Sequence, residues 1–105
     1  MRLWLDDVRE PWRHGYIACE WAKTAQEAIE MLKTGSITEA SLDHDLSYNA
    51  ETGNWRAEET GYTVVCWMEE NNVWPTDGVK VHSANPVGRK RMQVVIDKHY
   101  KGERR

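Results

Sequence analysis

Three short apolar segments of this chain are each followed directly by polar side chains that can bind metal ions or phosphate or transfer protons. The segments are residues 3–5, 40–42 and 79–81, followed by Asp6-Asp7, by Asp43-His44-Asp45 and by His82-Ser83-Ala84-Asn85. Short apolar runs that alternate with helical patterns are typical of βα units around a mainly parallel sheet. The carboxyl ends of parallel strands meet at one edge, where open α/β domains bind ligands. The pattern therefore predicts an α/β domain with its working site at that edge.

The intervening segments carry helix and turn signals. We expect a strand at residues 16–21, helices at 24–35, at 61–72 and after residue 85, and a polar loop at 46–59. Thr24 and Glu27 form a T-x-x-E capping box, which favours a helix start. Asn85 and Pro86 suit an N-cap and a first helical position. Pro11 instead indicates a turn where a longer first helix would be expected.

Length and charge limit the possible classes of protein. The chain has 105 residues, enough for one domain, which we place at residues 1–100 with a frayed tail at 101–105. The net charge is −3, from 14 basic and 17 acidic residues. A general nucleic-acid coat is normally basic, so neither that role nor sequence-specific DNA binding is expected.

The cellular setting is predicted from apolar runs and cysteines. No apolar run approaches the length that spans a bilayer, and the N-terminus turns acidic too early for a signal peptide, so no membrane partner is expected. Cys19 and Cys66 lie in apolar stretches without metal-type spacing. We expect both thiols to be reduced and buried, and the protein to be cytoplasmic.

The strand-end carboxylates predict a cation site. Asp6, Asp7, Asp43 and Asp45 would crowd together if the first and third strands are neighbours, and repulsion among them requires a cation, a raised pKa or a nearby basic side chain. A single Asp after a strand is usually a turn former, but three such strand ends favour a functional site. Oxygen ligands suit Mg²⁺ or Mn²⁺, and nearby histidines shift the preference toward Mn²⁺.

The start of the last helix predicts a phosphate site. Three cations, Arg89, Lys90 and Arg91, oppose the helix dipole there, which costs stability unless they bind an anion. We expect Arg89 to point toward the site, and Arg9 and Arg13 are further candidates to approach the same region after the first strand. Ser83 and Asn85 precede this helix and are further phosphate-binding candidates. Gly-rich phosphate loops and a nucleophile elbow are missing from the sequence, so the usual nucleotide-binding and hydrolase motifs are not expected.

Four segments together resemble the cyclic-phosphate processing receiver domain family. They are L-W-L-D-D-V-R at residues 3–9, S-L-D-H-D-L at 41–46, T-G-Y at 60–62 and V-H-S-A-N-P-V-G at 81–88. The resemblance implies action on cyclic phosphate ends of RNA or nucleotides. It also implies a three-layer, receiver-like (truncated flavodoxin-like) fold with a four-stranded, mostly parallel sheet in the order 2-1-3-4.

The chain is more distantly similar to response-regulator receiver domains. In those, an acidic pair after the first strand and an Asp after the third hold Mg²⁺, and a Ser or Thr after the fourth contacts the phosphoryl group. By position these roles fall on Asp6 and Asp7, on Asp43 or Asp45, and on Ser83. His44 and His82 are not receiver-like, so ordinary phosphorelay signalling is not expected.

These observations lead to one leading function and two alternatives. The leading function is a metal-dependent phosphoesterase-like activity on a cyclic phosphate, with His44 or His82 as general acid or base and Ser83 as a further catalytic candidate. The partner is then a phosphate-containing small molecule or an RNA end. One alternative is a non-catalytic module that binds a phosphate or nucleotide. The other is a degenerate receiver that acts as a protein-interaction switch.

Overall fold

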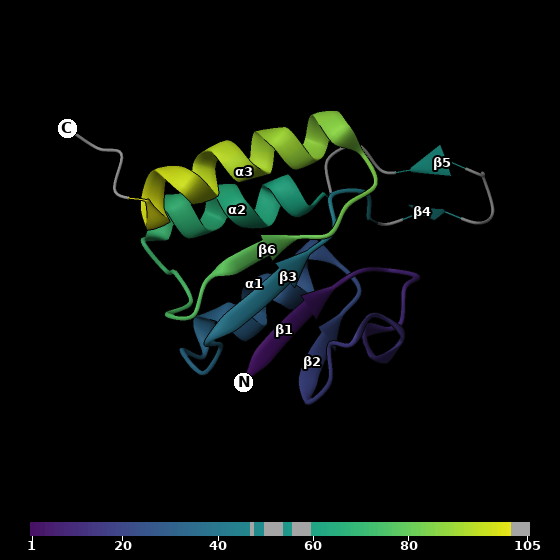
Figure 1. Ribbon diagram of the computed structural model, residues 1–105, viewed down its shortest axis with the longest axis horizontal. Helices are drawn as coiled ribbons and strands as arrows, with labels where there is room; N and C mark the ends of the chain where they lie inside the picture. The colour runs from purple at the N-terminus through teal and green to yellow at the C-terminus, as the bar shows by residue number, and fades with distance from the viewer. Residues whose placement is uncertain (47, 50–53, 56–59, 102–105) are drawn as a thin grey trace.

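A four-stranded parallel sheet forms the centre of the computed structural model, which describes residues 1–46, 48–49, 54–55 and 60–101. Its strands are β1 (Arg2–Leu5), β2 (Cys19–Ala22), β3 (Glu39–Leu42) and β6 (Val79–Val81). The helices are the 3₁₀ turn η1 (Pro11–His14), α1 (Ala25–Lys33), α2 (Gly61–Asn71) and α3 (Pro86–Tyr100). The sheet order β2-β1-β3-β6 (Figure 1) confirms the predicted α/β class and the order 2-1-3-4.

The second strand begins later than predicted. Residues 16–21 were expected to be extended, but β2 spans Cys19–Ala22. The Tyr16 backbone N–H donates to the Pro11 carbonyl at 3.0 Å and closes η1. Gly15 and Ala18 then take positive φ angles of 76° and 55°, so the chain turns before it enters the sheet. The short η1 agrees with the expectation that a long first helix is missing at this point.

The start of α1 differs from the predicted capping box in one bond. The Thr24 side chain accepts a hydrogen bond from the Glu27 backbone N–H at 3.1 Å, as predicted. The Glu27 carboxylate accepts from the Lys23 N–H at 2.8 Å, one residue before the N-cap. Gly35 follows the helix with a φ of 78°, which a glycine adopts without strain.

The predicted loop at 46–59 contains a short strand pair. β4 (Tyr48–Asn49) and β5 (Asn54–Trp55) pair antiparallel, with Asn49 opposite Asn54. They lie beyond the carboxyl ends of the central strands (Figure 1). Residues 47, 50–53 and 56–59 of the predicted loop, and residues 102–105 of the predicted tail, lie outside the described residues.

The two faces of the sheet differ in their cover. Leu3, Leu5, Leu42 and Val79 pack into one core with buried side chains of α1, α2 and α3. Because side chains alternate along a strand, the residues between them point to the other face. We call Trp4, Ser41, Lys80 and His82 the open face. Among the described residues, the third layer over this face is the segment around η1 rather than an α-helix.

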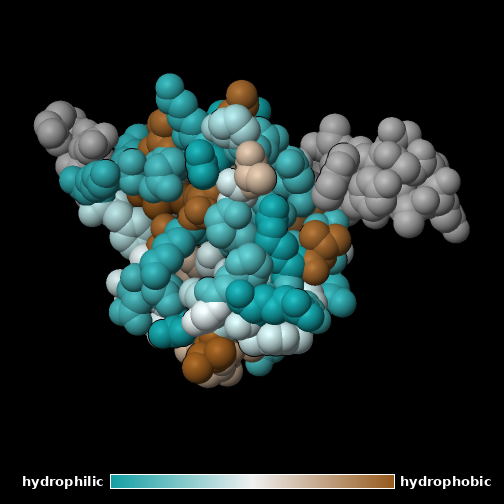
Figure 2. Space-filling view, turned by 45° about the vertical axis from the view of Figure 1, so that its right-hand side comes forward, coloured by the Kyte–Doolittle hydropathy of each residue, from teal (hydrophilic) through white to brown (hydrophobic). Residues whose placement is uncertain are grey.

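The surface of the protein is mixed in hydropathy, and both cysteines lie near it. On the side shown in Figure 2, hydrophobic residues are scattered among hydrophilic ones. Within the described ranges, no helix has the length and apolarity needed to cross a bilayer. Cys19 and Cys66 are unpaired, and both are partly exposed rather than buried as predicted.

Candidate functional site

Three aspartates meet at the carboxyl edge of the sheet. Asp6 directly follows β1 and Asp43 directly follows β3, and backbone bonds from Asp6 N to Ala22 O (3.0 Å) and from Asp43 N to Leu5 O (2.9 Å) continue the sheet ladder past the strand ends. Asp6, Asp7 and Asp43 each offer one carboxylate oxygen, and these oxygens lie within 4.8 Å of one another. We call these three residues the acidic cluster.

Asp6 is held in its ionised form. Its side chain is buried, and its Oδ1 accepts backbone hydrogen bonds from Val8 (2.9 Å) and Arg9 (2.8 Å). Its Oδ2 accepts from Arg9 Nη1 at 3.1 Å and pairs with His82 Nε2 at 3.0 Å. Burial by itself raises the pKa, but the hydrogen bonds from His82, Arg9 and Val8 outweigh it and lower the pKa of Asp6 to about 2.

Asp43 is in the opposite situation. Burial and the negative charge of Asp6 raise the pKa of Asp43, and the positive charge of Arg9 offsets only part of this rise. The Arg9 guanidinium lies 3.5 Å from Asp43 Oδ2 as well as 3.1 Å from Asp6 Oδ2, so it bridges the two carboxylates. A group with a lowered pKa thus sits beside one with a raised pKa, which is a common sign of a functional site.

His82 is fixed at both ring nitrogens. Its Nε2 pairs with Asp6, and its Nδ1 lies 2.8 Å from Ser41 Oγ. Its ring stacks on the Trp4 indole with the centroids 3.9 Å apart and the planes at 4°. His82 is therefore well placed to hold Asp6 in position, with both nitrogens engaged by the protein.

A second histidine–carboxylate pair lies next to the acidic cluster. His44 Nδ1 is 2.9 Å from Asp45 Oδ1, which also accepts from Asn85 Nδ2 at 3.2 Å. The Asn85 backbone N–H donates to Ser83 Oγ at 3.0 Å. The structure therefore groups Asp45 with His44 and Asn85, and groups Asp43 with Asp6 and Asp7.

Two glycines allow helices to approach the site closely. A Cβ on Gly61, the first residue of α2, would lie 2.0 Å from the Asp43 carbonyl oxygen, and the Gly61 N–H donates to the His44 carbonyl at 2.9 Å. A Cβ on Gly88 would lie 2.4 Å from the His44 ring. Any side chain at either position would displace the segment that carries Asp43 and His44.

One of the arginines expected near the site reaches the acidic cluster. Arg89 is exposed on α3, and Arg9 is the arginine that contacts the acidic cluster. Arg13 pairs with Glu10 instead. The helix begins as predicted, because Asn85 Oδ1 accepts from the Gly88 N–H at 3.0 Å.

Comparison with known proteins agrees with this arrangement. The chain matches the family model of the cyclic-phosphate processing receiver domain over residues 1–98. It belongs to this family. No curated protein and no solved structure matched the chain. The family match covers every strand of the central sheet and both histidine–carboxylate pairs.

The acidic cluster of this receiver domain suits a hard divalent cation. Its donors are carboxylate oxygens, which Mg²⁺ and Mn²⁺ prefer, and it lies where receiver domains bind Mg²⁺. Among the described residues, three carboxylates face the guanidinium of Arg9, so a divalent ion would balance the remaining negative charge. The residues present therefore fit the metal that the family implies.

Sequence reasoning missed two contributors to this receiver domain's site. Ser41 lies inside β3 between Ala40 and Leu42, and Trp4 lies inside β1. Their signal is the alternation along these strands, which places both on the face opposite the helices. A polar residue between two buried apolar residues of a parallel strand, as Ser41 is between Ala40 and Leu42, is unusual enough to indicate such a role.

Proposed function

We propose that this protein hydrolyses a cyclic phosphate on a nucleotide or an RNA end, with a divalent cation held by the acidic cluster. The proposal is carried by one observation: Asp6, Asp7 and Asp43 bring carboxylate oxygens within 4.8 Å of one another in a member of a cyclic-phosphate processing family. When bound, Mg²⁺ or Mn²⁺ would polarise the phosphoryl group and offset its charge. Asp45 lies one residue beyond His44 and supports the site from its edge.

The proposed reaction needs water and no other reactant. The water oxygen forms a bond to phosphorus, and one ester bond of the phosphate ring breaks. The released ribose oxygen takes up the proton that the water loses, so the product is a phosphate monoester. The protein must hold the phosphate, accept a proton from water and return one to the leaving oxygen.

Residues at the start of α3 are proposed to hold the phosphate. Ser83 and Asn85 form the turn between β6 and α3, beside the helix N-terminus, where backbone N–H groups and the helix dipole favour an anion. Arg89 is exposed on the same helix, where it can meet a phosphate from the solvent side. Arg9 supplies a second guanidinium at the acidic cluster.

His44 is the better placed of the two histidines for proton transfer. A neutral imidazole whose Nδ1 donates to Asp45 presents Nε2 as its basic nitrogen. His82 has both nitrogens engaged by Asp6 and Ser41, so we assign it a positioning role through Asp6. This assignment narrows the sequence-based prediction, in which either histidine served as acid or base.

The test is turnover of a nucleoside 2′,3′-cyclic phosphate followed by ³¹P NMR with Mg²⁺ or Mn²⁺ present. We expect a monoester signal to replace the cyclic one. Asp43→Asn should abolish the change, and Asp77→Asn, which alters an exposed aspartate, should not. Binding without turnover would support the alternative of a binding module. Labelling by acetyl phosphate would support the receiver-like switch. A protein that neither binds the nucleotide nor melts differently with metal would contradict the proposal.

A further inference from the structure

We propose that a cavity on the open face binds the nucleoside part of a nucleoside 2′,3′-cyclic phosphate. The proposal rests on the proposed function, and it adds a binding site for the base and ribose to the site for the phosphate. The cavity has a volume of about 390 Å³, and its lining includes Trp4, Tyr16, Lys80 and His82. Pockets that bind small molecules usually measure roughly 300–1,000 Å³, so this cavity is large enough for one nucleoside.

Flat rings line one part of the cavity. The His82 and His14 rings both stack on the Trp4 indole, at centroid distances of 3.9 and 5.6 Å and interplanar angles of 4° and 22°. His14 is exposed, and Tyr16 lies against Trp4 at 5.3 Å. Nucleobases stack on aromatic and imidazole rings whatever their sequence. A base of any identity can therefore stack on the exposed His14 ring, which the buried rings of Trp4 and Tyr16 support from below.

Polar groups at the rim suit a ribose. Glu39 accepts a hydrogen bond from the Tyr16 hydroxyl at 3.2 Å and lies 3.6 Å from Lys80 Nζ. Tyr16 and Lys80 line the cavity, and Glu39 is their neighbour. The 2′ and 3′ oxygens of the ligand belong to its cyclic phosphate, so the ribose offers its ring oxygen and its 5′-oxygen, which can accept a hydrogen bond from Lys80 Nζ.

The cavity is continuous with the candidate site. Arg9, His82 and Ser83 line it, and Arg9 and His82 are the two side chains that contact the Asp6 carboxylate. A nucleoside in the cavity would therefore direct its phosphate toward the carboxyl edge of the sheet. One ligand then spans both regions, with the phosphate at the start of α3 and the base over the open face.

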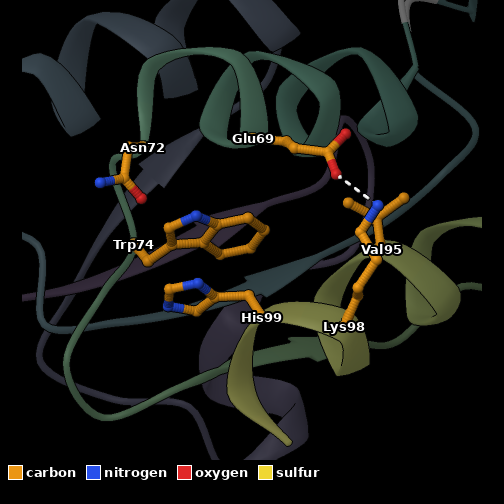
Figure 3. A pocket seen from close by; sticks show the side chains of 6 residues that line it. All are labelled: Glu69, Asn72, Trp74, Val95, Lys98 and His99. Carbon is orange, nitrogen blue, oxygen red and sulfur yellow. Dashed lines mark ion pairs between the residues drawn. The ribbon is translucent and has the colours of Figure 1, made fainter. Parts of the chain in front are cut away.

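A second cavity offers a useful contrast. It lies between α2 and α3 near their C-terminal ends and measures about 150 Å³ (Figure 3). There His99 stacks on Trp74 at 4.4 Å, and Lys98 pairs with Glu69 at 3.1 Å. This cavity has the same stacked histidine–tryptophan pair, and the C-terminal ends of α2 and α3 that form it lie near the beginning of β6, whereas the acidic cluster follows the ends of β1 and β3 (Figure 1). It provides a matched control.

The experiment is a titration of ¹⁵N-labelled protein with four probes: uridine, inorganic phosphate, uridine 2′,3′-cyclic phosphate and a short RNA with a cyclic phosphate end. Uridine should shift the signals of the Trp4 indole N–H and of the Lys80 backbone. Inorganic phosphate should shift Ser83 and Asn85. Uridine 2′,3′-cyclic phosphate and the RNA should each shift the signals of Trp4 and Lys80 together with those of Ser83 and Asn85. The ligand that binds more tightly shows whether the nucleoside comes from a free nucleotide or from an RNA end.

Variants make the test specific. His14→Ala should weaken uridine binding about five-fold or more, the low end of the effect of removing one stacking side chain. His99→Ala, the same change on the matched pair, should leave uridine binding unchanged. If uridine shifts no signal of the open face while the cyclic nucleotide is hydrolysed, the nucleoside site is wrong and the proposed function stands. If uridine binds the open face but no cyclic phosphate is turned over, the nucleoside site stands and the proposed activity fails.

Discussion

Exchanging a single carboxylate for an amide should have opposite effects at Asp6 and Asp43. Repulsion among carboxylates alone would lead one to expect that either exchange stabilises the metal-free protein. The contacts say otherwise for Asp6, because its two oxygens accept four hydrogen bonds from Val8, Arg9 and His82. An asparagine there would turn an amide N–H₂ toward groups that already donate.

The size of the effect at Asp6 follows from its pKa. A fall from 3.8 to about 2 means that the folded protein stabilises the ionised form by about 2 kcal/mol. In a domain of this size roughly 1 kcal/mol moves the melting temperature by 4–8 °C, so Asp6→Asn should melt about 10 °C lower. At Asp43 the raised pKa has the opposite meaning, and Asp43→Asn should be at least as stable as wild type.

The assay is urea unfolding followed by tryptophan fluorescence, with a chelator present. The stability that ionised Asp6 provides is present above pH 3.8 and is lost as the pH falls toward about 2, so the deficit of Asp6→Asn should shrink over that interval. Asp43 has a raised pKa, so wild type should gain on Asp43→Asn as the pH falls. Asp77→Asn controls for a surface exchange. Equal stability of Asp6→Asn and wild type at neutral pH, or a shift of both variants in one direction, would refute the reasoning.

Three further predictions concern neighbouring residues. Arg9→Gln should lower the stability of the metal-free protein but tighten Mn²⁺ binding, since the guanidinium neutralises the carboxylates that the ion needs; metal-dependent melting measures both. Gly88→Ala should cost about 1–3 kcal/mol in urea unfolding, because its methyl group meets the His44 ring, and unchanged stability would contradict this packing. Arg89→Ala should weaken calorimetric binding of a cyclic nucleotide several-fold and Lys90→Ala should not; equal losses would indicate a diffuse basic patch.

The proximity of Asp6 and Asp43 could be predicted from the sequence because it depends on two features of the strands. Each residue directly follows an apolar strand, and parallel strands present their carboxyl ends together. The ladder bonds that run past β1 and β3 then fix both backbones. Distances between strand ends are set by strand pairing, so a pattern of short strands is sufficient to locate them.

The sequence indicated Arg9, Arg13 and Arg89 as arginines near the site but could not decide which of them contacts the carboxylates. Whether Arg9 or Arg89 points inward depends on the turn after β1 and on the rotation of α3, and neither follows from an apolar pattern. In the structure the Val8 and Arg9 N–H groups bind Asp6 Oδ1, and this turn directs the Arg9 side chain back over the carboxylate. Local hydrogen bonding of this kind is decided by backbone geometry.

The late start of β2 has a similar origin. Residues Tyr16 and Ile17 have strand-like side chains, and propensity alone favours extending the strand over them. The positive φ angles at Gly15 and Ala18 redirect the chain, and Tyr16 instead packs against Trp4. Tertiary packing of one aromatic pair outweighs the local preference.

The contact of Gly61 with the strand-end turn makes one amide a reporter of the whole site. Its N–H is hydrogen-bonded to the carbonyl of His44, so hydrogen exchange at this amide requires that α2 separate from the segment that carries Asp43 and His44. α2 also packs on α3, where Arg91 Cζ lies 4.3 Å from the centroid of the Tyr62 ring. Such an opening would therefore also loosen the start of α3, where the phosphate is proposed to bind. The exchange rate of the Gly61 amide therefore measures how often α2 separates from the segment that carries Asp43 and His44.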